Sequence, residues 1–198
     1  MVEKSLTTRV ADEALSLPAS MIITYHPPIF KPLSSLTLSN PIQASLLRCA
    51  AAGISVYSPH SALDSVYEGI NDWLASGLGS GHVDPIGDEH PCGRGGSGRL
   101  LKLDEKTTLT SLQERAKKHL GLTQCLYHTG SLLSLLDRTE TLSTSRTVQV
   151  ALSTDSPNDE VYSVAICAGS GGSMLLGVDA DVYLTGEMSH VRRNTRRS

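Results

Sequence analysis

Two short apolar runs, each ending at a proline and a histidine, dominate the pattern in the first third of the chain. Residues 21–25 (MIITY) and 54–58 (ISVYS) are rich in β-branched side chains, which is typical of buried strands. His26 follows the first run directly before a proline, and His60 follows the proline that ends the second run. Because proline gives no N–H group to a sheet, each strand should stop there and place an imidazole at its carboxyl end.

Helical periodicity lies before each run, over residues 7–15 and 40–53. The second helix should begin at Asn40-Pro41, an N-cap followed by proline at the first helical position. Its predicted buried face consists of Ile42, Leu46, Cys49 and Ala50. Alternating helices and strands favour parallel pairing through right-handed crossovers, so both histidines should lie at one edge of one sheet.

That edge is where ligands bind in open α/β sheets. Asp64 lies four residues after His60, which adds a carboxylate to the same predicted loop. A lone histidine at a strand end is more often a hydrogen-bonded loop residue than a ligand. Two strand ends with side chains of this kind make the functional interpretation stronger than either one does alone.

The rest of the chain alternates further helices and strands with glycine-rich segments. Helices are expected over residues 69–78 and 108–120, and strands over 100–103, 124–128, 147–152, 161–167 and 181–185. Residues 77–99 are glycine-rich and are predicted to form a flexible loop. The polar side chains His82, Asp84, Asp88, Glu89 and His90 in it are interpreted as solvated loop residues rather than a metal cluster.

A glycine-rich turn, Ala168 to Ser173, follows the strand predicted at 161–167. Its residues Gly169, Ser170, Gly171, Gly172 and Ser173 could point backbone N–H groups at an anion. A tight turn that needs positive φ explains the same glycines equally well. The spacing matches neither the dinucleotide fingerprint nor a P-loop. Glu187 and His190 then follow the last predicted strand, again a carboxylate and an imidazole at a strand end.

Composition limits the classes of protein to consider. The chain of 198 residues carries a net charge of −3, so it is not expected to bind nucleic acid or membranes as a whole. A basic tail at 191–198 is predicted to be disordered. The four cysteines form no CxxC pair, no run reaches transmembrane length, and the N-terminus lacks a signal-peptide pattern. A cytoplasmic location is expected, with a nuclear or mitochondrial one left open.

Five motifs together resemble one family. They are Tyr25 to Pro32 (YHPPIFKP), Tyr57 to Asp64 (YSPHSALD), Gly69 to Ala75 (GINDWLA), Cys167 to Ser173 (CAGSGGS) and Ala180 to His190 (ADVYLTGEMSH). The order resembles the Nif3-like family, dinuclear-metal-centre proteins also called GTP cyclohydrolase I type 2 homologues. The Tyr-His-Pro-Pro form resembles its eukaryotic, fungal-like branch.

This resemblance implies a three-layer α/β/α fold with a mostly parallel mixed sheet, here forming one domain over residues 1–190. It also implies a homo-oligomer, often a hexameric ring, and two divalent ions such as zinc, iron or manganese. Of the family's metal ligands, His26 and Asp64 carry over, and Tyr25 takes the first place of a His-His pair. His60 and Glu187 are candidate neighbours of the ions.

The resemblance also has gaps. The family's opening helix and first strand are not recognised before Thr7, and its late His and Glu ligands are not found after His190. The chain is therefore expected to be truncated at both ends, with an incomplete C-terminus, an open ligand shell and weakened metal affinity.

Three functions follow from these expectations. The first is a metal-dependent hydrolase acting on a phosphate- or nucleotide-containing small molecule, with residues 169–173 holding the anionic group. No catalytic residue is assigned. The alternatives are a non-enzymatic protein that binds a transcriptional regulator, as the family name records, or a truncated product with an incomplete metal site.

Overall fold

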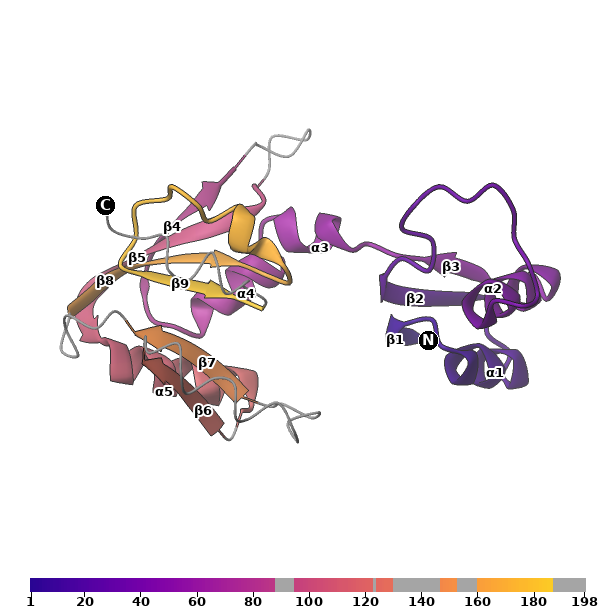
Figure 1. Ribbon diagram of the computed structural model, residues 1–198, viewed down its shortest axis with the longest axis horizontal. Helices are drawn as coiled ribbons and strands as arrows, with labels where there is room; N and C mark the ends of the chain where they lie inside the picture. Colours follow the sequence, from indigo (N-terminus) through magenta and orange to yellow (C-terminus); the bar gives the residue numbers. More distant parts are fainter. Residues whose placement is uncertain (88–94, 123, 130–146, 153–159, 187–198) are drawn as a thin grey trace. The chain divides into compact units, whose positions relative to one another are not determined.

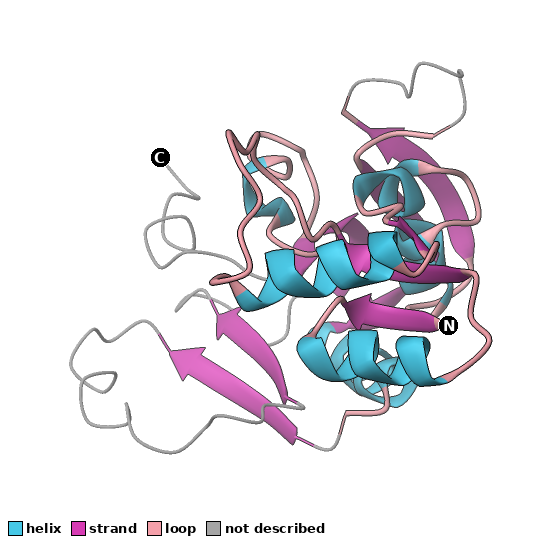
Figure 2. Ribbon diagram, turned by 90° about the vertical axis from the view of Figure 1, so that its right-hand side faces the viewer, coloured by secondary structure: helices cyan, strands magenta, loops and turns pink. Residues whose placement is uncertain are grey.

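In the computed structural model, the chain forms two compact units, Met1–Leu63 and Asp64–Ser198. The structure describes residues 1–87, 95–122, 124–129, 147–152 and 160–186 (Figure 1). Both helices and strands are present (Figure 2), and the sheets are parallel or mixed, which confirms the predicted α/β class. The single domain over residues 1–190 stays a prediction.

The first unit is built on a three-stranded parallel sheet. It contains β1 (Val2–Ser5), α1 (Thr8–Ser16), β2 (Met21–His26), α2 (Pro41–Ala51) and β3 (Ser55–Tyr57). The strand order is β1-β2-β3, with parallel pairing throughout, as predicted for β2 and β3. Parallel neighbours need a crossover connection, and α1 and α2 supply the two crossovers. The core of this unit consists of Leu6, Ala11, Ala14, Ile22, Cys49 and Ile54.

The start of α2 confirms the predicted cap. The Asn40 side chain accepts hydrogen bonds from the backbone N–H groups of Ile42 and Gln43, at 3.0 and 3.2 Å. Cys49 is buried as expected, but Ile42 is 46% exposed and Ala50 is also exposed, so the predicted face is wrong at both positions. A sheet of short strands covers only a narrow stripe of the helix, which leaves the flanks of the predicted face in water.

A strand lies before Thr7, where the resemblance showed none, and this corrects the expectation that the first strand is missing. In β1, Val2 pairs with Ile23 and Ser5 pairs with His26. The strand is largely exposed and shows no alternation of buried and exposed residues. Its hydrogen bonds to β2 define it, and a four-residue polar sequence gives no local signal for such pairing.

The second unit contains a four-stranded mixed sheet, in the order β4-β5-β8-β9. Its elements are α4 (Ile70–Ser76), β4 (Gly81–Ile86), β5 (Gly98–Thr108), α5 (Leu109–Leu120), β8 (Glu160–Cys167), the 3-10 turn η1 (Gly171–Ser173) and β9 (Val182–Thr185). Strands β6 (Gln124–Thr129) and β7 (Thr147–Leu152) form a separate parallel pair, and α3 (Ser61–Ser65) spans the division between the units. None of the described helices has the length and apolar character needed to cross a bilayer.

Strand β4 corrects the prediction of a continuous loop over residues 77–99. It pairs antiparallel with β5 from Gly81 opposite Leu103 to Ile86 opposite Gly98. A Cβ at Gly81 would lie 2.1 Å from the backbone oxygen of Lys102, so glycine permits this close pairing. The glycines that suggested a loop therefore allow two strands to approach each other. The predicted loop residues Asp88, Glu89 and His90 lie outside the described residues.

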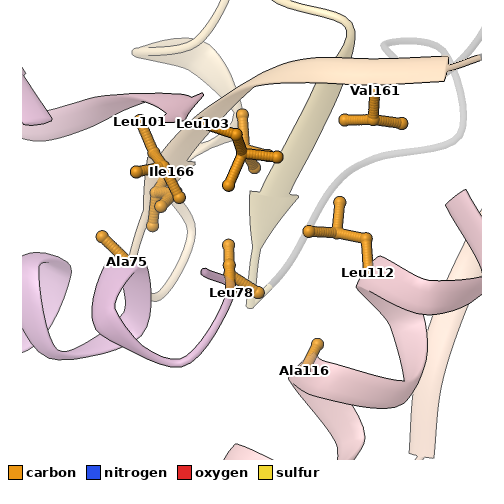
Figure 3. Packing of buried hydrophobic residues seen from close by; sticks show 9 residues of the cluster. Ala75, Leu78, Leu101, Leu103, Leu112, Ala116, Val161 and Ile166 are labelled. Carbon is orange, nitrogen blue, oxygen red and sulfur yellow. The ribbon is translucent and has the colours of Figure 1, made fainter. Parts of the chain in front are cut away.

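Helices α4 and α5 pack against β5 and β8 to form the main core of the second unit (Figure 3). The core residues are Ala75, Leu78, Leu101, Leu103, Leu112, Ala116, Val161, Val164 and Ile166. Helix α5 confirms the helix predicted over residues 108–120. It follows the N-cap Thr108 and ends at Gly121, which is in the left-handed region (φ 63°). Trp73 in α4 is 49% exposed, and its ring lies tilted against that of His119 with 4.3 Å between centroids.

Candidate functional site

Four rings gather at the carboxyl ends of β2 and β3. His26 and His60 lie edge to face with 6.1 Å between ring centroids, and Tyr25 lies 5.0 Å from His26 and 5.6 Å from His60. Phe30 contacts His60 edge-on at 5.8 Å. We call Tyr25, His26, Phe30 and His60 the ring cluster. The prediction that the two histidines share one sheet edge is confirmed, because parallel strands bring their carboxyl ends together.

A serine on β1 fixes the orientation of His26. The Oγ atom of Ser5 lies 3.0 Å from Nδ1 of His26, its partner in the β1–β2 register. When the proton is on Nδ1, this hydroxyl accepts its hydrogen bond and Nε2 keeps a free lone pair. Such a bond on the other ring nitrogen is how proteins orient ligating histidines. Sequence reasoning missed Ser5, since only the pairing of β1 with β2 places it beside His26.

A buried threonine holds the ends of β2 and β3 together. The Thr24 hydroxyl lies 2.8 Å from the Ser58 hydroxyl and 3.1 Å from the His26 carbonyl oxygen, and Thr24 is fully buried. His60 has a positive φ of 41°, a conformation that side chains other than glycine rarely adopt. Strained residues of this kind cluster at functional sites, and this supports a functional placement of His60.

The donor set of the ring cluster fits part of a metal shell. Two imidazoles that share one tetrahedral ion at Zn–N distances near 2.0–2.1 Å stand roughly 5–6 Å apart between centroids. His26 and His60 are 6.1 Å apart, slightly wider than that spacing. Imidazole nitrogens suit zinc, iron and other borderline divalent ions. Among the described residues, no group of three or more His, Cys, Asp or Glu side chains could hold an ion. The two-ion centre therefore stays a prediction.

The other predicted ligand, Asp64, begins the second unit, in α3. Its backbone is held by Asn71, which is fully buried in α4. The Asn71 amide group donates to the carbonyl oxygens of Asp64 and Ser97, at 3.0 and 3.1 Å, and its oxygen accepts from the Ala168 N–H at 2.8 Å. One side chain thus joins the Asp64 segment to the residue before β5 and to the start of the glycine-rich turn.

A buried arginine reinforces the same region. Arg99 is 0% exposed, and its Nε and Nη2 atoms each donate to Asp72 oxygens at 2.8 Å. It also donates to the carbonyl oxygens of Ser65, Val66, Gly96 and Gly98. These bonds engage every N–H group of the guanidinium, which is how a buried charge is tolerated. The motif at 69–75 contains Asn71 and Asp72, but their partners are distant in sequence.

The Cys167 thiol lies at this junction. It is buried and donates to the Ser97 carbonyl oxygen at 3.2 Å. Burial raises the pKa of the Cys167 thiol, and the negative charge of Asp64 raises that pKa further.

We predict that Asp64→Asn lowers the pKa of the Cys167 thiol, because the neutral amide no longer opposes thiolate formation. The measurement is the β-carbon chemical shift of Cys167 followed by NMR against pH. Asp84→Asn, on the exposed strand β4, serves as the control and should leave that titration unchanged. Identical curves for both variants would mean that Asp64 does not act on the thiol.

Two positions of the glycine-rich turn after β8 require glycine, one for its backbone conformation and one for close packing. Gly169 adopts φ 63°, and a Cβ at Gly171 would lie 2.2 Å from the Cys167 sulfur. Residues 171–173 form the 3-10 turn η1. The tight-turn interpretation is therefore confirmed for Gly169, while anion binding by Gly169, Ser170, Gly171, Gly172 and Ser173 stays a prediction. Glu187 lies outside the described residues.

His82 and Asp84 lie on β4 rather than in a loop, but they are solvated as predicted. His82 has a side chain 75% exposed, and its Nε2 atom lies 2.9 Å from Asp84. The other Asp84 oxygen pairs with Lys102 at 3.1 Å. Lys102 is the main cause of a lowered pKa at Asp84, with His82 contributing to the same shift. This exposed network explains both side chains without a metal.

Comparison with known proteins identifies the family. Residues 2–197 match the family described as Duf34/NIF3 (NGG1p interacting factor 3). The chain belongs to this family. It is 40% identical over 195 residues to "Protein NIF3 homolog" of Schizosaccharomyces pombe, covering 93% of this chain and 60% of that protein. It is 31% identical over 191 residues to the "GTP cyclohydrolase 1 type 2 homolog" of Lactococcus lactis, covering 95% and 63%.

Comparison of structures agrees with the family found from the sequence. A crystal structure of a Bacillus cereus protein related to NIF3 matches 97% of this chain and 73% of its own, with a TM-score of 0.66 at 18% identity. The resemblance read from the motifs is therefore confirmed, including the presence of fungal relatives. The chain spans about 60% of the length of its fission-yeast relative.

Proposed function

We propose that this NIF3-family chain carries metal- and ligand-binding residues of a metal-dependent hydrolase that acts on a phosphate- or nucleotide-containing small molecule. The observation that carries the proposal is the His26–His60 pair at the carboxyl ends of β2 and β3, with Ser5 on the Nδ1 atom of His26. The name of the Lactococcus lactis relative, a GTP cyclohydrolase 1 type 2 homolog, supports hydrolysis of a nucleotide.

In this proposal, Nε2 of His26 and the imidazole of His60 hold one divalent ion of zinc, iron or manganese. Asp64 is a further ligand, and Tyr25 and Glu187 are neighbours, as the resemblance implies. A bound divalent ion would supply Lewis-acid polarisation of a phosphoryl oxygen. The protein's own part is to orient and hold: Ser5 fixes the His26 ring, and Thr24 fixes the two strand ends. Residues 169–173 would bind the anionic group.

The matched test compares three histidines. His26→Ala should weaken zinc binding by more than about 100-fold. A residue that only hydrogen-bonds to a metal ligand contributes up to about 100-fold, so a larger loss indicates direct ligation. His60→Ala should have a similar effect, and His82→Ala, which changes an exposed strand residue, should have none. Competition with a chromogenic chelator measures the affinities, and circular dichroism checks that each variant folds. Equal losses in all three variants would rule out the site at the ends of β2 and β3.

A second candidate is a non-enzymatic role as a partner of a transcriptional regulator. The family description, NGG1p interacting factor 3, favours it, and so do exposed apolar residues that follow β2. These residues are Ile29, Phe30, Leu33, Leu36 and Leu38. Nucleotide hydrolysis assays with added zinc, manganese or iron separate the two functions. A purified chain that binds no metal and shows no metal-stimulated hydrolysis would exclude the enzyme and leave the interaction role. Homo-oligomerisation and a cytoplasmic location belong to both proposals.

A further inference from the structure

Phe30 is the exposed member of the ring cluster. It is the single phenylalanine among 198 residues, and 74% of it is exposed. Isolated exposed apolar side chains are common and need no explanation. Phe30 differs because its ring contacts His60 edge-on, with 5.8 Å between centroids, so it lies directly beside a proposed ligand of the metal. Its exposed surface is therefore available beside the imidazole pair.

The segment that carries Phe30 is stiffened by its sequence. Pro27 and Pro28 precede it and Pro32 follows it, which restricts the backbone on both sides of the ring. Limiting the motion of a binding segment lowers the entropy lost when a ligand binds. The strand end that carries His26 leads directly into this segment. The prolines thus reduce the backbone freedom of the segment that places the ring beside His60.

We propose that Phe30 is a specificity-determining residue that stacks on a planar heteroaromatic ring, such as a nucleobase, in a phosphate-bearing ligand held at His26 and His60. This inference rests on the proposed function, because it needs a ligand at the imidazole pair. Phenyl rings stack on any base through its π face, so the contact selects the class of ligand rather than one base. In a nucleotide, a single sugar separates the base from the phosphate, a spacing that suits a stacking residue next to the ligating group.

The alternative occupant of Phe30 is a protein surface, and the chain supplies a matched control for it. Leu38 belongs to the same segment after β2, and its exposure of 75% is close to the 74% of Phe30. Leu38 lies eight residues after Phe30, beyond Pro32, and is not a member of the ring cluster. A protein partner would bury both side chains, whereas a stacked base needs Phe30 alone.

The experiment measures the binding of GMP and of ribose 5-phosphate to the full chain with zinc present, by calorimetry. Wild type should bind GMP more tightly than ribose 5-phosphate. Phe30→Ala should weaken GMP binding roughly tenfold, as loss of a stacked base does, with unchanged affinity for ribose 5-phosphate and zinc. Phe30→Trp should keep the wild-type preference, and Leu38→Ala should change none of the three affinities.

The outcomes distinguish this inference from the proposed function. Equal GMP affinity in wild type and Phe30→Ala, with zinc and ribose 5-phosphate still bound, overturns the stacking role alone. Binding of neither phosphate ligand by wild type overturns both. A change of oligomeric state in Phe30→Ala and Leu38→Ala, seen by size-exclusion chromatography without a change in GMP affinity, would assign the segment to a protein interface instead.

Discussion

Arg99→Met should lower the free energy of unfolding of the second unit by roughly 3–5 kcal/mol, the typical effect of breaking a buried ion pair by removing one partner. The substitution leaves Asp72 without its buried cation and removes the donors from four backbone carbonyl oxygens. Domains of this size are stable by only about 5–15 kcal/mol in total, so this loss removes a large share of the stability.

A single tryptophan makes the measurement specific to the second unit. Trp73 lies in α4, so its fluorescence during a denaturant titration reports on that unit. Arg115→Met is the matched control: Arg115 is exposed and donates a hydrogen bond to the Leu78 carbonyl oxygen at 2.9 Å. Its loss should cost about 1 kcal/mol. Equal midpoint shifts for the two variants would contradict the role assigned to Arg99.

Asn71→Ala should lower the stability of the same unit by about 3 kcal/mol or more. The change leaves the carbonyl oxygens of Asp64 and Ser97 and the N–H group of Ala168 without their partner. Each buried polar group left unpaired costs about 1–3 kcal/mol. Because Asn71 is fully buried, water does not readily replace these bonds.

Hydrogen exchange tests the position of Asn71 as well as its contribution to stability. In Asn71→Ala the Ala168 amide should exchange faster relative to the amides of β5, because its acceptor is gone. Ser76→Ala, on the same helix, removes one exposed hydrogen bond to the Trp73 carbonyl oxygen and should change stability by about 0.5 kcal/mol at most. Unaltered protection of the Ala168 amide in Asn71→Ala would show that Asn71 does not hold the glycine-rich turn after β8.

These two buried side chains have a consequence for the proposed site. Asn71 binds the backbone at Asp64, and Arg99 binds it at Ser65 and Val66. The position of the predicted ligand Asp64 therefore depends on residues that bind no ligand themselves. Variants at Asn71 or Arg99 that still fold should weaken any contribution of Asp64 to metal binding.

The strand ends and helix caps were predictable because they follow from short-range chemistry. β-branched runs followed by proline set the ends of β2 and β3, and with them the positions of His26 and His60. Caps set the helix boundaries, with Asn40 at the start of α2 and Gly121 at the end of α5. Each of these signals acts within a few residues, so each can be recognised in a single sequence without knowledge of the fold.

The contacts that orient these residues form between segments that are far apart in the sequence, so no local pattern predicts them. Ser5 meets His26 through strand register, and Arg99 meets the segment after Asp64 across more than thirty residues of sequence. Strand β4 formed where glycines suggested a loop, because Gly81 admits the backbone of Lys102 at close range. Pairing, burial and close approach depend on which distant segment arrives as a neighbour. The sequence around Ser5, Asn71 or Gly81 would look the same whether or not a distant segment packs against that residue, so it does not reveal the contact.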